Sequence, residues 1–114
     1  MNDGLGFIDG LIVDTHFVKR GRFGRLAHAV ARMPNARVGI GLGEDAAMII
    51  TNGNEAKCVG SGMVIVIDGS DIGATNIANA DDITPIAIEN LKVHILAEGC
   101  KYLITERKFV LNEQ

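Results

Sequence analysis

Apolar residues follow two different spacings in the first part of the chain. Residues 10–14 (Gly-Leu-Ile-Val-Asp) form a short apolar run, and residues 37–42 form another. Continuous runs of this kind are typical of strands buried on both faces of a parallel sheet. Between them, apolar residues recur at the spacing of one helix face and stop before Pro34, at Phe23, Leu26, Ala27, Val30 and Ala31. The order of strand, helix and strand predicts a parallel β-α-β unit.

The rest of the chain predicts short strands joined by turns. The strands are expected at residues 46–51, 55–59, 63–67, 91–97, 102–105 and 108–111. Asn52-Gly53 between the first two runs is a strong hairpin signal, and Gly60-Ser61-Gly62 marks the next turn. Residues 70–85 are polar and irregular. Because no repeat or linker interrupts the pattern, we expect residues 1–114 to form a single β-rich α/β domain.

Composition narrows the class of protein. Hydrophobic residues make up 47% of the 114 residues, which excludes a disordered chain. Cys58 and Cys100 have neither the spacing of a disulfide framework nor that of a zinc site, so both are interpreted as reduced thiols. No run approaches the roughly 18 apolar residues of a membrane span, and the first residues do not resemble a signal peptide. We therefore expect a cytoplasmic protein without a membrane partner.

Basic residues are concentrated in one segment, although the net charge is -3. No acidic residue occurs between Asp14 and Glu44, a window that holds six of the 11 basic side chains. Arg20, Arg22 and Arg25 fall at the start of the predicted helix, where cations are unfavourable by about 0.3–1 kcal/mol each. A bound anion would offset this cost, whereas a solvated basic face would not need one. Nucleic acid is a poor fit because the cluster is small and the net charge is negative.

Two groups of side chains follow predicted strands and could carry chemistry. Asp14-Thr15-His16 follows the first strand, and Glu44-Asp45 follows the next. Catalytic groups in α/β sheets collect at the carboxyl ends of strands, so His16 and Glu44 would share one sheet edge. An acid placed there could orient the imidazole, as in a Ser-His-acid triad. A structural histidine and an acid pair that caps a turn are equally compatible with these positions.

No serine lies where a hydrolase nucleophile is expected. Ser61 lies between two predicted strands, whereas the G-x-S-x-G elbow joins a strand to a helix, so we interpret Ser61 as a turn residue. Residues 39–43 lack the spacing of a dinucleotide fingerprint, and no cofactor is predicted. Asp-x-His after a strand also begins metallophosphatase sites, but His28 and His94 do not supply matching ligands, so no metal is predicted.

Residues 14–26 resemble the most distinctive segment of the cyanophycinase family. That segment reads Asp-Gln-His-Phe, two variable residues, Arg-x-Arg, two more, and Arg-Leu. The matching positions are Asp14, His16, Phe17, Arg20, Arg22, Arg25 and Leu26. Further similarity is found in residues 4–7, 39–46, 60–62 and 64–69. This chain departs from the family pattern at Thr15, where Gln is usual, at Gly43, where Asp is usual, and at Ala46, where Thr is usual.

The resemblance implies the C-terminal part of an α/β/α, Rossmann-like serine exopeptidase, with a β-α-β unit followed by β-hairpins. The family degrades cyanophycin, a polyaspartate with arginine on each side chain, to β-aspartyl-arginine dipeptides. By resemblance, His16 is the general base and Glu44 the triad acid. The substrate pocket would consist of Asp14, Thr15, Arg20, Arg22, Arg25 and Asp45.

The same resemblance leaves the nucleophile to be found elsewhere. The family carries its serine in an N-terminal half, and we expect this chain to begin after that half. Self-association, or a second chain that carries the serine, is therefore expected. The alternative function is a non-catalytic binding domain that holds an acidic partner through the basic residues between Arg20 and Arg25.

Overall fold

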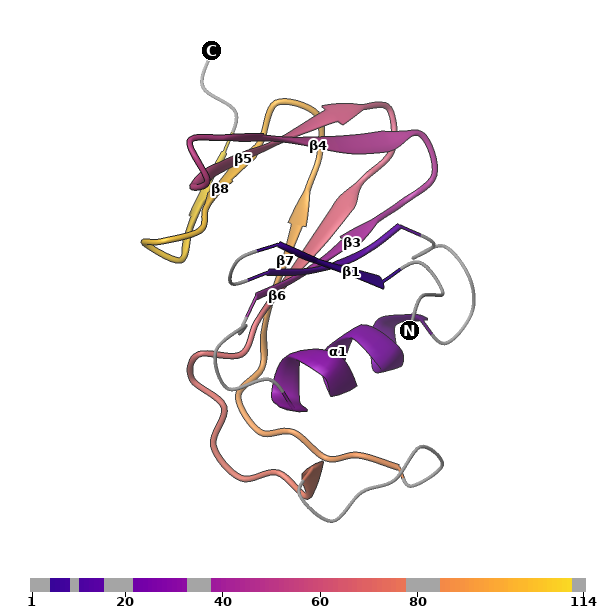
Figure 1. Ribbon diagram of the computed structural model, residues 1–114, viewed down its shortest axis with the longest axis vertical. Helices are drawn as coiled ribbons and strands as arrows, with labels where there is room; N and C mark the ends of the chain where they lie inside the picture. Colours follow the sequence, from indigo (N-terminus) through magenta and orange to yellow (C-terminus); the bar gives the residue numbers. More distant parts are fainter. Residues whose placement is uncertain (1–4, 9–10, 16–21, 33–37, 78–84, 112–114) are drawn as a thin grey trace.

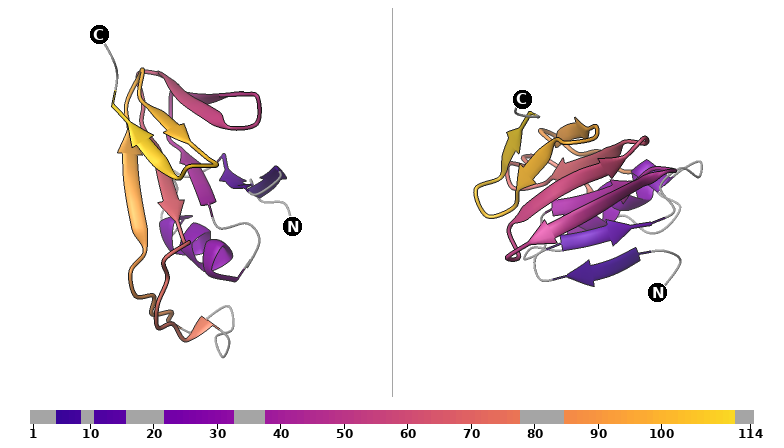
Figure 2. Two further views of the ribbon diagram at one scale, coloured as in Figure 1. Left: turned by 90° about the vertical axis from the view of Figure 1, so that its left-hand side faces the viewer. Right: turned by 90° about the horizontal axis from the view of Figure 1, so that it is seen from above.

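The computed structural model describes residues 5–8, 11–15, 22–32, 38–77 and 85–111. They form three layers, in which helix α1 (Arg22–Arg32) lies on one face of sheet A and sheet B lies on the other (Figures 1 and 2). Sheet A has the strand order β1 (Leu5–Ile8), β2 (Leu11–Asp14), β3 (Val38–Leu42), β6 (Val64–Asp68) and β7 (Lys92–Leu96). Sheet B has the order β4 (Ala46–Thr51), β5 (Glu55–Gly60), β8 (Lys101–Leu103) and β9 (Lys108–Val110).

The central strands of sheet A carry side chains for two cores. On β6, Val64 and Val66 face sheet B, while Ile65 and Ile67 face α1. Full burial of such a side chain stabilises the fold by about 1.5–3 kcal/mol. The core between the sheets consists of Leu11, Val38, Ile40, Cys58, Val64, Val66, Leu96, Cys100 and Tyr102. The core beneath the helix consists of Ile12, Leu26, Ala27, Val30 and Ile67. Both faces of these strands are therefore covered, which explains their continuous apolar runs.

Helix α1 confirms most of the predicted apolar stripe and corrects one member. Leu26, Ala27 and Val30 are buried, whereas Phe23 is 44% exposed because it lies in the first turn, at the end of the helix. The helix packs closely on β3 because residue 39 is glycine. A Cβ atom at Gly39 would lie 2.7 Å from Val30 Cγ2, which is too close for a side chain.

Strand pairing confirms the β-α-β unit and the hairpins. β2 and β3 are parallel, and every other strand pair within the two sheets is antiparallel. The described strand boundaries differ from the predicted ones by at most two residues. The class is therefore mixed α/β, as predicted. The Rossmann-like α/β/α arrangement is not seen in the described residues, because sheet B occupies the face of sheet A opposite α1.

Strand β1 was not predicted from the apolar pattern. It pairs antiparallel with β2, with Ile8 opposite Leu11. The intervening residues, Asp9 and Gly10, are a dipeptide typical of two-residue hairpin turns. This dipeptide could have indicated the hairpin from the sequence, although the apolar run of residues 5–8 is short.

Residues 69–77 and 85–91 extend as an arm beyond sheet A (Figure 1). Its two sides are joined by backbone hydrogen bonds, including Gly73 N to Glu89 O at 3.0 Å and Glu89 N to Ala74 O at 2.9 Å. The Asn76 side chain donates to Pro85 O and accepts from Ala87 N, at 3.1 and 2.9 Å. The irregular stretch predicted here is thus partly ordered by an amide side chain. No helix among the described residues is long and apolar enough to cross a membrane.

Candidate functional site

The carboxyl ends of β2 and β3 lie side by side. Their parallel register places Asp14 opposite Gly41, so residues that follow either strand emerge at one edge of sheet A. Asp14 is fully buried, and because it alternates with Val13 its side chain lies on the α1 face. Thr15 follows in an exposed turn. A buried carboxylate is costly unless polar or cationic groups compensate it, which makes Asp14 a notable member of this edge.

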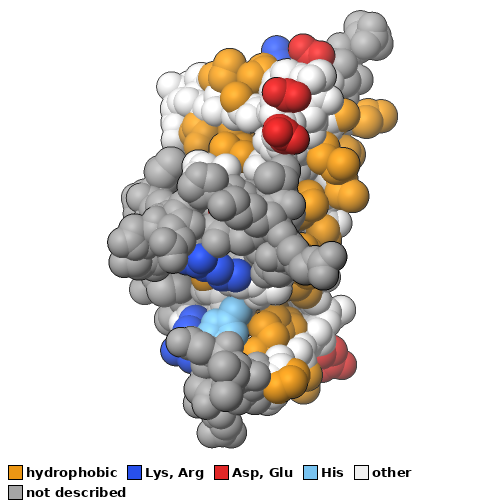
Figure 3. Space-filling view, turned by 90° about the vertical axis from the view of Figure 1, so that its right-hand side faces the viewer, with side chains coloured by type: hydrophobic (Ala, Val, Ile, Leu, Met, Phe, Trp, Pro, Cys, Tyr) orange, Lys and Arg blue, Asp and Glu red, His pale blue; other side chains and the backbone are white. Residues whose placement is uncertain are grey.

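The basic end of α1 belongs to the same edge. A crossover helix runs back along the sheet, so its first turn lies near the end of the preceding strand. The helix begins at Arg22, and its first turn contains no acidic residue. Arg25 is half-buried in that turn. In Figure 3, basic side chains are seen at the level of the helix, and acidic side chains gather nearer sheet B.

Glu44 and Asp45 occupy a corner between the two sheets. The chain leaves sheet A after β3, turns through these residues and enters sheet B as β4. Both side chains are exposed, and Asp45 adopts a φ of 62°. The segment that connects β5 to β6 lies beside this turn. Two hydrogen bonds join the segments, from Gly43 N to Met63 O and from Gly62 N to Asp45 O, each 3.0 Å long. The acids therefore project from a bent, two-stranded ribbon.

Two glycines allow the two paths of this corner to approach each other. A Cβ atom at Gly62 would collide with Glu44 O, and one at Gly60 would collide with Asp45 O. Gly60 also has a φ of 101°, which other residues rarely adopt. Gly60-Ser61-Gly62 is thus the support of the acid-bearing turn. Ser61 is exposed between β5 and β6 and does not lie on a strand-to-helix elbow.

Gly62→Ala is expected to lower the free energy of unfolding by about 1–3 kcal/mol, because backbone atoms must move to admit the methyl group. Chemical denaturation of the variant checks this value. Gly24→Ala is the matched control: Gly24 lies in α1 with open space around its Cα, so alanine should stabilise by about 0.5–1 kcal/mol. Equal effects at the two positions would show that the corner is not tightly packed.

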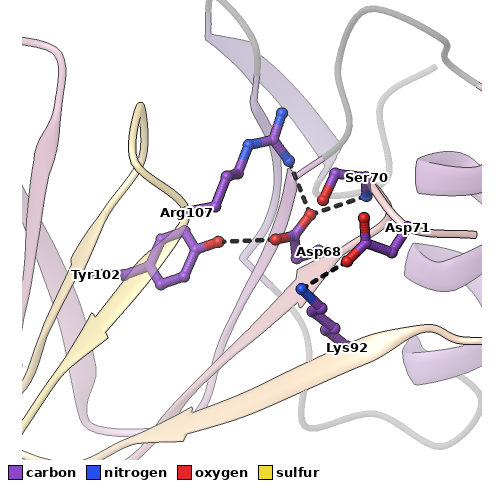
Figure 4. A network of polar contacts seen from close by, with 6 residues as sticks. All are labelled: Asp68, Ser70, Asp71, Lys92, Tyr102 and Arg107. Atoms are coloured by element: carbon purple, nitrogen blue, oxygen red, sulfur yellow. Dashed lines mark hydrogen bonds and ion pairs between the residues drawn. The ribbon is translucent and has the colours of Figure 1, made fainter.

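A second polar cluster, which the sequence did not predict, surrounds buried Asp68 at the end of β6 (Figure 4). Tyr102 Oη donates to Asp68 Oδ2 at 3.2 Å, and Arg107 Nη1 pairs with Oδ1 at 2.8 Å. Ser70 N also donates to Oδ1, at 2.9 Å. Tyr102 and Arg107 belong to sheet B and its last turn, so this cluster ties the two sheets together. Asp68 pairs with Val38, the first residue of β3, whereas Asp14 pairs with Gly41 near the end of that strand. Asp68 and Asp14 therefore lie at opposite ends of the strands of sheet A.

The Asp68 cluster has a defined charge state. Burial alone would raise the pKa of Asp68, but the hydrogen bonds from Ser70 and the positive charge of Arg107 outweigh it, and the pKa lies below its usual value. Burial, with the nearby Asp68 carboxylate, raises the pKa of Tyr102 well above its usual value. The cluster is therefore an ionised carboxylate held by a neutral phenol and a cation.

Cys58 and Cys100 are neighbours in the core between the sheets. Both are buried free thiols, and Cys58 N donates to Cys100 O at 2.9 Å. Burial, followed by the charges of Cys100 and Glu98, raises the pKa of the Cys58 thiol. A thiol in this state is a poor nucleophile, so neither the sequence nor the geometry favours Cys58 as a catalytic group.

Most of the predicted site residues that the structure describes end or directly follow strand β2 or β3. Asp14, Thr15, Arg25, Glu44 and Asp45 emerge at one edge of the β2–β3 pair or at the adjoining start of α1. The backbone of Arg22 begins that helix. His16 and Arg20 lie outside the described residues. Among the residues with assigned positions, no three His, Cys, Asp or Glu side chains are grouped to hold a metal ion.

Curated cyanophycinases are similar to this chain over most of its length. The protein from Trichormus variabilis is 36% identical over 107 residues, which cover 94% of this chain and 36% of the relative. Those from Geminocystis herdmanii and Synechococcus elongatus are 37% and 35% identical over 99 residues, or 87% of this chain. No protein-family profile matches. The chain spans about a third of the length of these relatives, between 30% and 36%. With this identity across nearly its whole sequence, the chain belongs to the cyanophycinase family.

Proposed function

We propose that this chain supplies the histidine and the acid of a Ser-His-Glu triad in a cyanophycinase-like peptidase. The observation that carries the proposal is the parallel pairing of β2 and β3, with Asp14 opposite Gly41. His16 follows the first strand by two residues, and Glu44 follows the second strand by two. Catalytic groups in such sheets gather at this edge, so the register supports a meeting of the two side chains.

In this proposal His16 acts as the general base. It accepts the proton of a serine hydroxyl as the serine attacks the peptide carbonyl, and later donates that proton to the leaving amine. Glu44 accepts a hydrogen bond from the other ring nitrogen and stabilises the imidazolium that forms. Its place on a glycine-supported corner suits this role, because a tightly packed backbone fixes the position of the Glu44 Cα from which the side chain extends.

The serine comes from outside this sequence. We propose that residues 1–114 form one domain that corresponds to the C-terminal part of a cyanophycinase, and that a preceding segment or a second chain carries the nucleophile. In support, the chain spans about a third of its relatives' length, and Ser61 lies in an exposed turn. Self-association is compatible with the same arrangement.

The proposed substrate is a cyanophycin-like peptide, in which carboxylates and guanidinium groups alternate. Arg22, Arg25 and Arg20 would bind the carboxylates, since guanidinium groups recognise them through paired hydrogen bonds. Asp14 and Asp45 would bind the arginine groups of the substrate, and Thr15 would contact the peptide beside them. Support comes from the first turn of α1, which carries arginines and no acid, and from Asp14, which is a buried carboxylate at the end of β2.

A chimeric enzyme tests the proposal. The matched segment of the Trichormus variabilis cyanophycinase is replaced by this chain, and release of β-aspartyl-arginine from cyanophycin is measured. We expect release by the chimera and none by the isolated chain. A folded chimera that binds cyanophycin without cleaving it would favour the alternative, a binding domain that uses the basic residues between Arg20 and Arg25.

A further inference from the structure

The outer face of sheet B carries basic and apolar side chains in ordered rows. Residues of a strand alternate between two faces, and Met48, Ala56 and Tyr102 pack toward sheet A, so their neighbours point away from the core. Strand pairing places the outward residues in rows. One row is Ile49, Lys57, Lys101 and Val110, and the next is Thr51, Glu55, Leu103 and Lys108. These two rows hold three lysines and one acid, in a chain whose net charge is -3.

Two of these lysines face each other across neighbouring strands. Lys57 lies directly opposite Lys101, an arrangement of like charges that is unfavourable in a sheet. Glu55 offsets part of this cost, because its carboxylate pairs with Lys101 at 2.6 Å. Lys57 is exposed and has no ion-pair partner within the part of the chain that the structure describes. Proteins tend to break such local rules at functional sites, and an anion held between the two ammonium groups would remove the repulsion.

The acid and the apolar residues of the two rows indicate which kind of anion fits. Glu55 lies two residues from Lys57 on the same face of β5, a step of about 6.5 Å, so a negative and a positive group are adjacent. Ile49 is 54% exposed beside Lys57, and Leu103 lies directly opposite Glu55. A carboxylate and a cation joined by an aliphatic stem would match these features. Neither row contains an aromatic side chain on which a base could stack, so nucleic acid fits less well.

We propose that the outer face of sheet B binds the arginine units of a cyanophycin-like polymer, at a site separate from the catalytic edge. In a β-aspartyl-arginine unit the amino group of the arginine is part of the amide bond, which leaves its carboxylate and guanidinium free. Lys57 and Lys101 bind the carboxylate, Glu55 binds the guanidinium, and Ile49 and Leu103 contact the three-carbon stem. The identity of the polymer rests on the proposed function, whereas the chemistry of the site rests on the two rows.

A second site of this kind keeps the polymer on the protein between cleavages. Because the polymer repeats the same unit, binding at sheet B raises its local concentration at the carboxyl ends of β2 and β3. Sheet A lies between sheet B and α1 (Figure 1), so the two sites use different side chains. Binding at sheet B can therefore be changed without altering the proposed triad or the arginines of α1.

Nuclear magnetic resonance of the 114-residue chain tests the site directly. The probe is Nα-acetyl-arginine, which has the carboxylate, the guanidinium and the acylated amino group of the polymer unit. We expect saturable shifts of backbone amide signals in β4, β5 and β8, with a dissociation constant on the order of millimolar. Nα-acetyl-citrulline, which lacks the cation, and Nα-acetyl-arginine amide, which lacks the carboxylate, should bind about fivefold more weakly or worse. Equal affinity for the three compounds, or shifts confined to other elements, would overturn the proposal.

Matched substitutions locate the charges that bind the probe. Lys57→Glu should weaken the binding of Nα-acetyl-arginine about tenfold, because it places a carboxylate where the proposal requires an ammonium group. Lys92→Glu makes the same change of charge at an exposed lysine of sheet A and should leave the dissociation constant unchanged. Circular dichroism verifies that both variants are folded. An equal loss of affinity in the two variants would reflect net charge alone and would rule out a site at Lys57.

The chimeric enzyme separates this inference from the proposed function. Lys57→Glu in the chimera should lower the rate of dipeptide release from insoluble cyanophycin about fivefold, and should leave kcat/KM for a short soluble oligomer unchanged. An unchanged rate on the insoluble polymer, or an equal loss with both substrates, would contradict a polymer-binding role for sheet B. A chimera that cleaves neither substrate would count against the proposed triad, while the binding measurements on the 114-residue chain would still decide the role of sheet B.

Discussion

Replacing His16 with alanine in the chimeric enzyme is expected to lower kcat roughly 10⁴- to 10⁶-fold. Without the imidazole, no group at the edge of sheet A accepts the serine proton or returns it to the leaving amine. The Michaelis constant should change little, because the pocket residues are intact. Initial rates of dipeptide release over a range of cyanophycin concentrations separate the two parameters. His28→Gln is the matched control, since His28 lies on α1 and the proposed chemistry does not use it.

Glu44→Gln should lower kcat roughly 10⁴-fold, because the amide cannot stabilise the imidazolium as a carboxylate does. Members of a triad act as a unit, so the double variant should be no slower than His16→Ala alone. Asp45→Asn, at the neighbouring position, should raise the Michaelis constant and leave kcat within a few fold. If Glu44→Gln and Asp45→Asn had the same small effect, the acid would have to be sought elsewhere.

Asp68→Ala is expected to have the largest effect on stability, a loss of about 3 kcal/mol from the free energy of unfolding. The substitution leaves the buried Tyr102 hydroxyl without its acceptor and the half-buried Arg107 without its counter-ion. The total free energy of unfolding of a domain of this size is roughly 5–15 kcal/mol, so this loss is a substantial fraction of it. Glu55→Gln breaks the exposed pair between Lys101 and Glu55, and should cost less than about 1 kcal/mol.

The lowered pKa of Asp68 means that the ionised form of this carboxyl is the one that stabilises the fold. Its pKa is lowered in the folded protein, so its contribution is complete above the unfolded value of about 3.9 and is lost as pH falls through the folded value. Asp68→Asn should therefore flatten the acid limb of the stability curve. Denaturation at several pH values checks this, and an unchanged acid limb would place the responsible carboxylate elsewhere.

Most of the fold could be predicted from the sequence, because the local sequence signals agree with the burial of each element. Strands β2 and β3 have continuous apolar runs because both of their faces are covered. Helix α1 has an apolar stripe because only one of its faces is covered. The location of the candidate edge could be predicted for the same reason, because Asp14 ends one buried strand and Glu44 closely follows the next. Phe23 was misjudged because periodicity does not reveal where the sheet beneath a helix ends.

The Asp68 cluster and the glycine corner could not be predicted in the same way. Tyr102 and Arg107 lie 34 and 39 residues from Asp68 in the sequence, and only the packing of sheet B on sheet A brings them together. From the sequence, Gly62 was predicted only to be part of a turn. Its second role, making room for the carbonyl of Glu44, depends on a strand pair that bends from one sheet into the other.

Tyr102 gives this protein an intrinsic optical probe. The chain has one tyrosine and no tryptophan, and that tyrosine is fully buried where the two sheets meet. Its ultraviolet absorption and fluorescence therefore originate at a single known point, with Asp68 as hydrogen-bond partner. Separation of sheet B from sheet A would expose this ring to water, whereas α1 packs on the opposite face of sheet A and does not cover it. Comparison of the tyrosine signal with far-ultraviolet circular dichroism would thus reveal whether the two sheets part in one step with α1 or ahead of it.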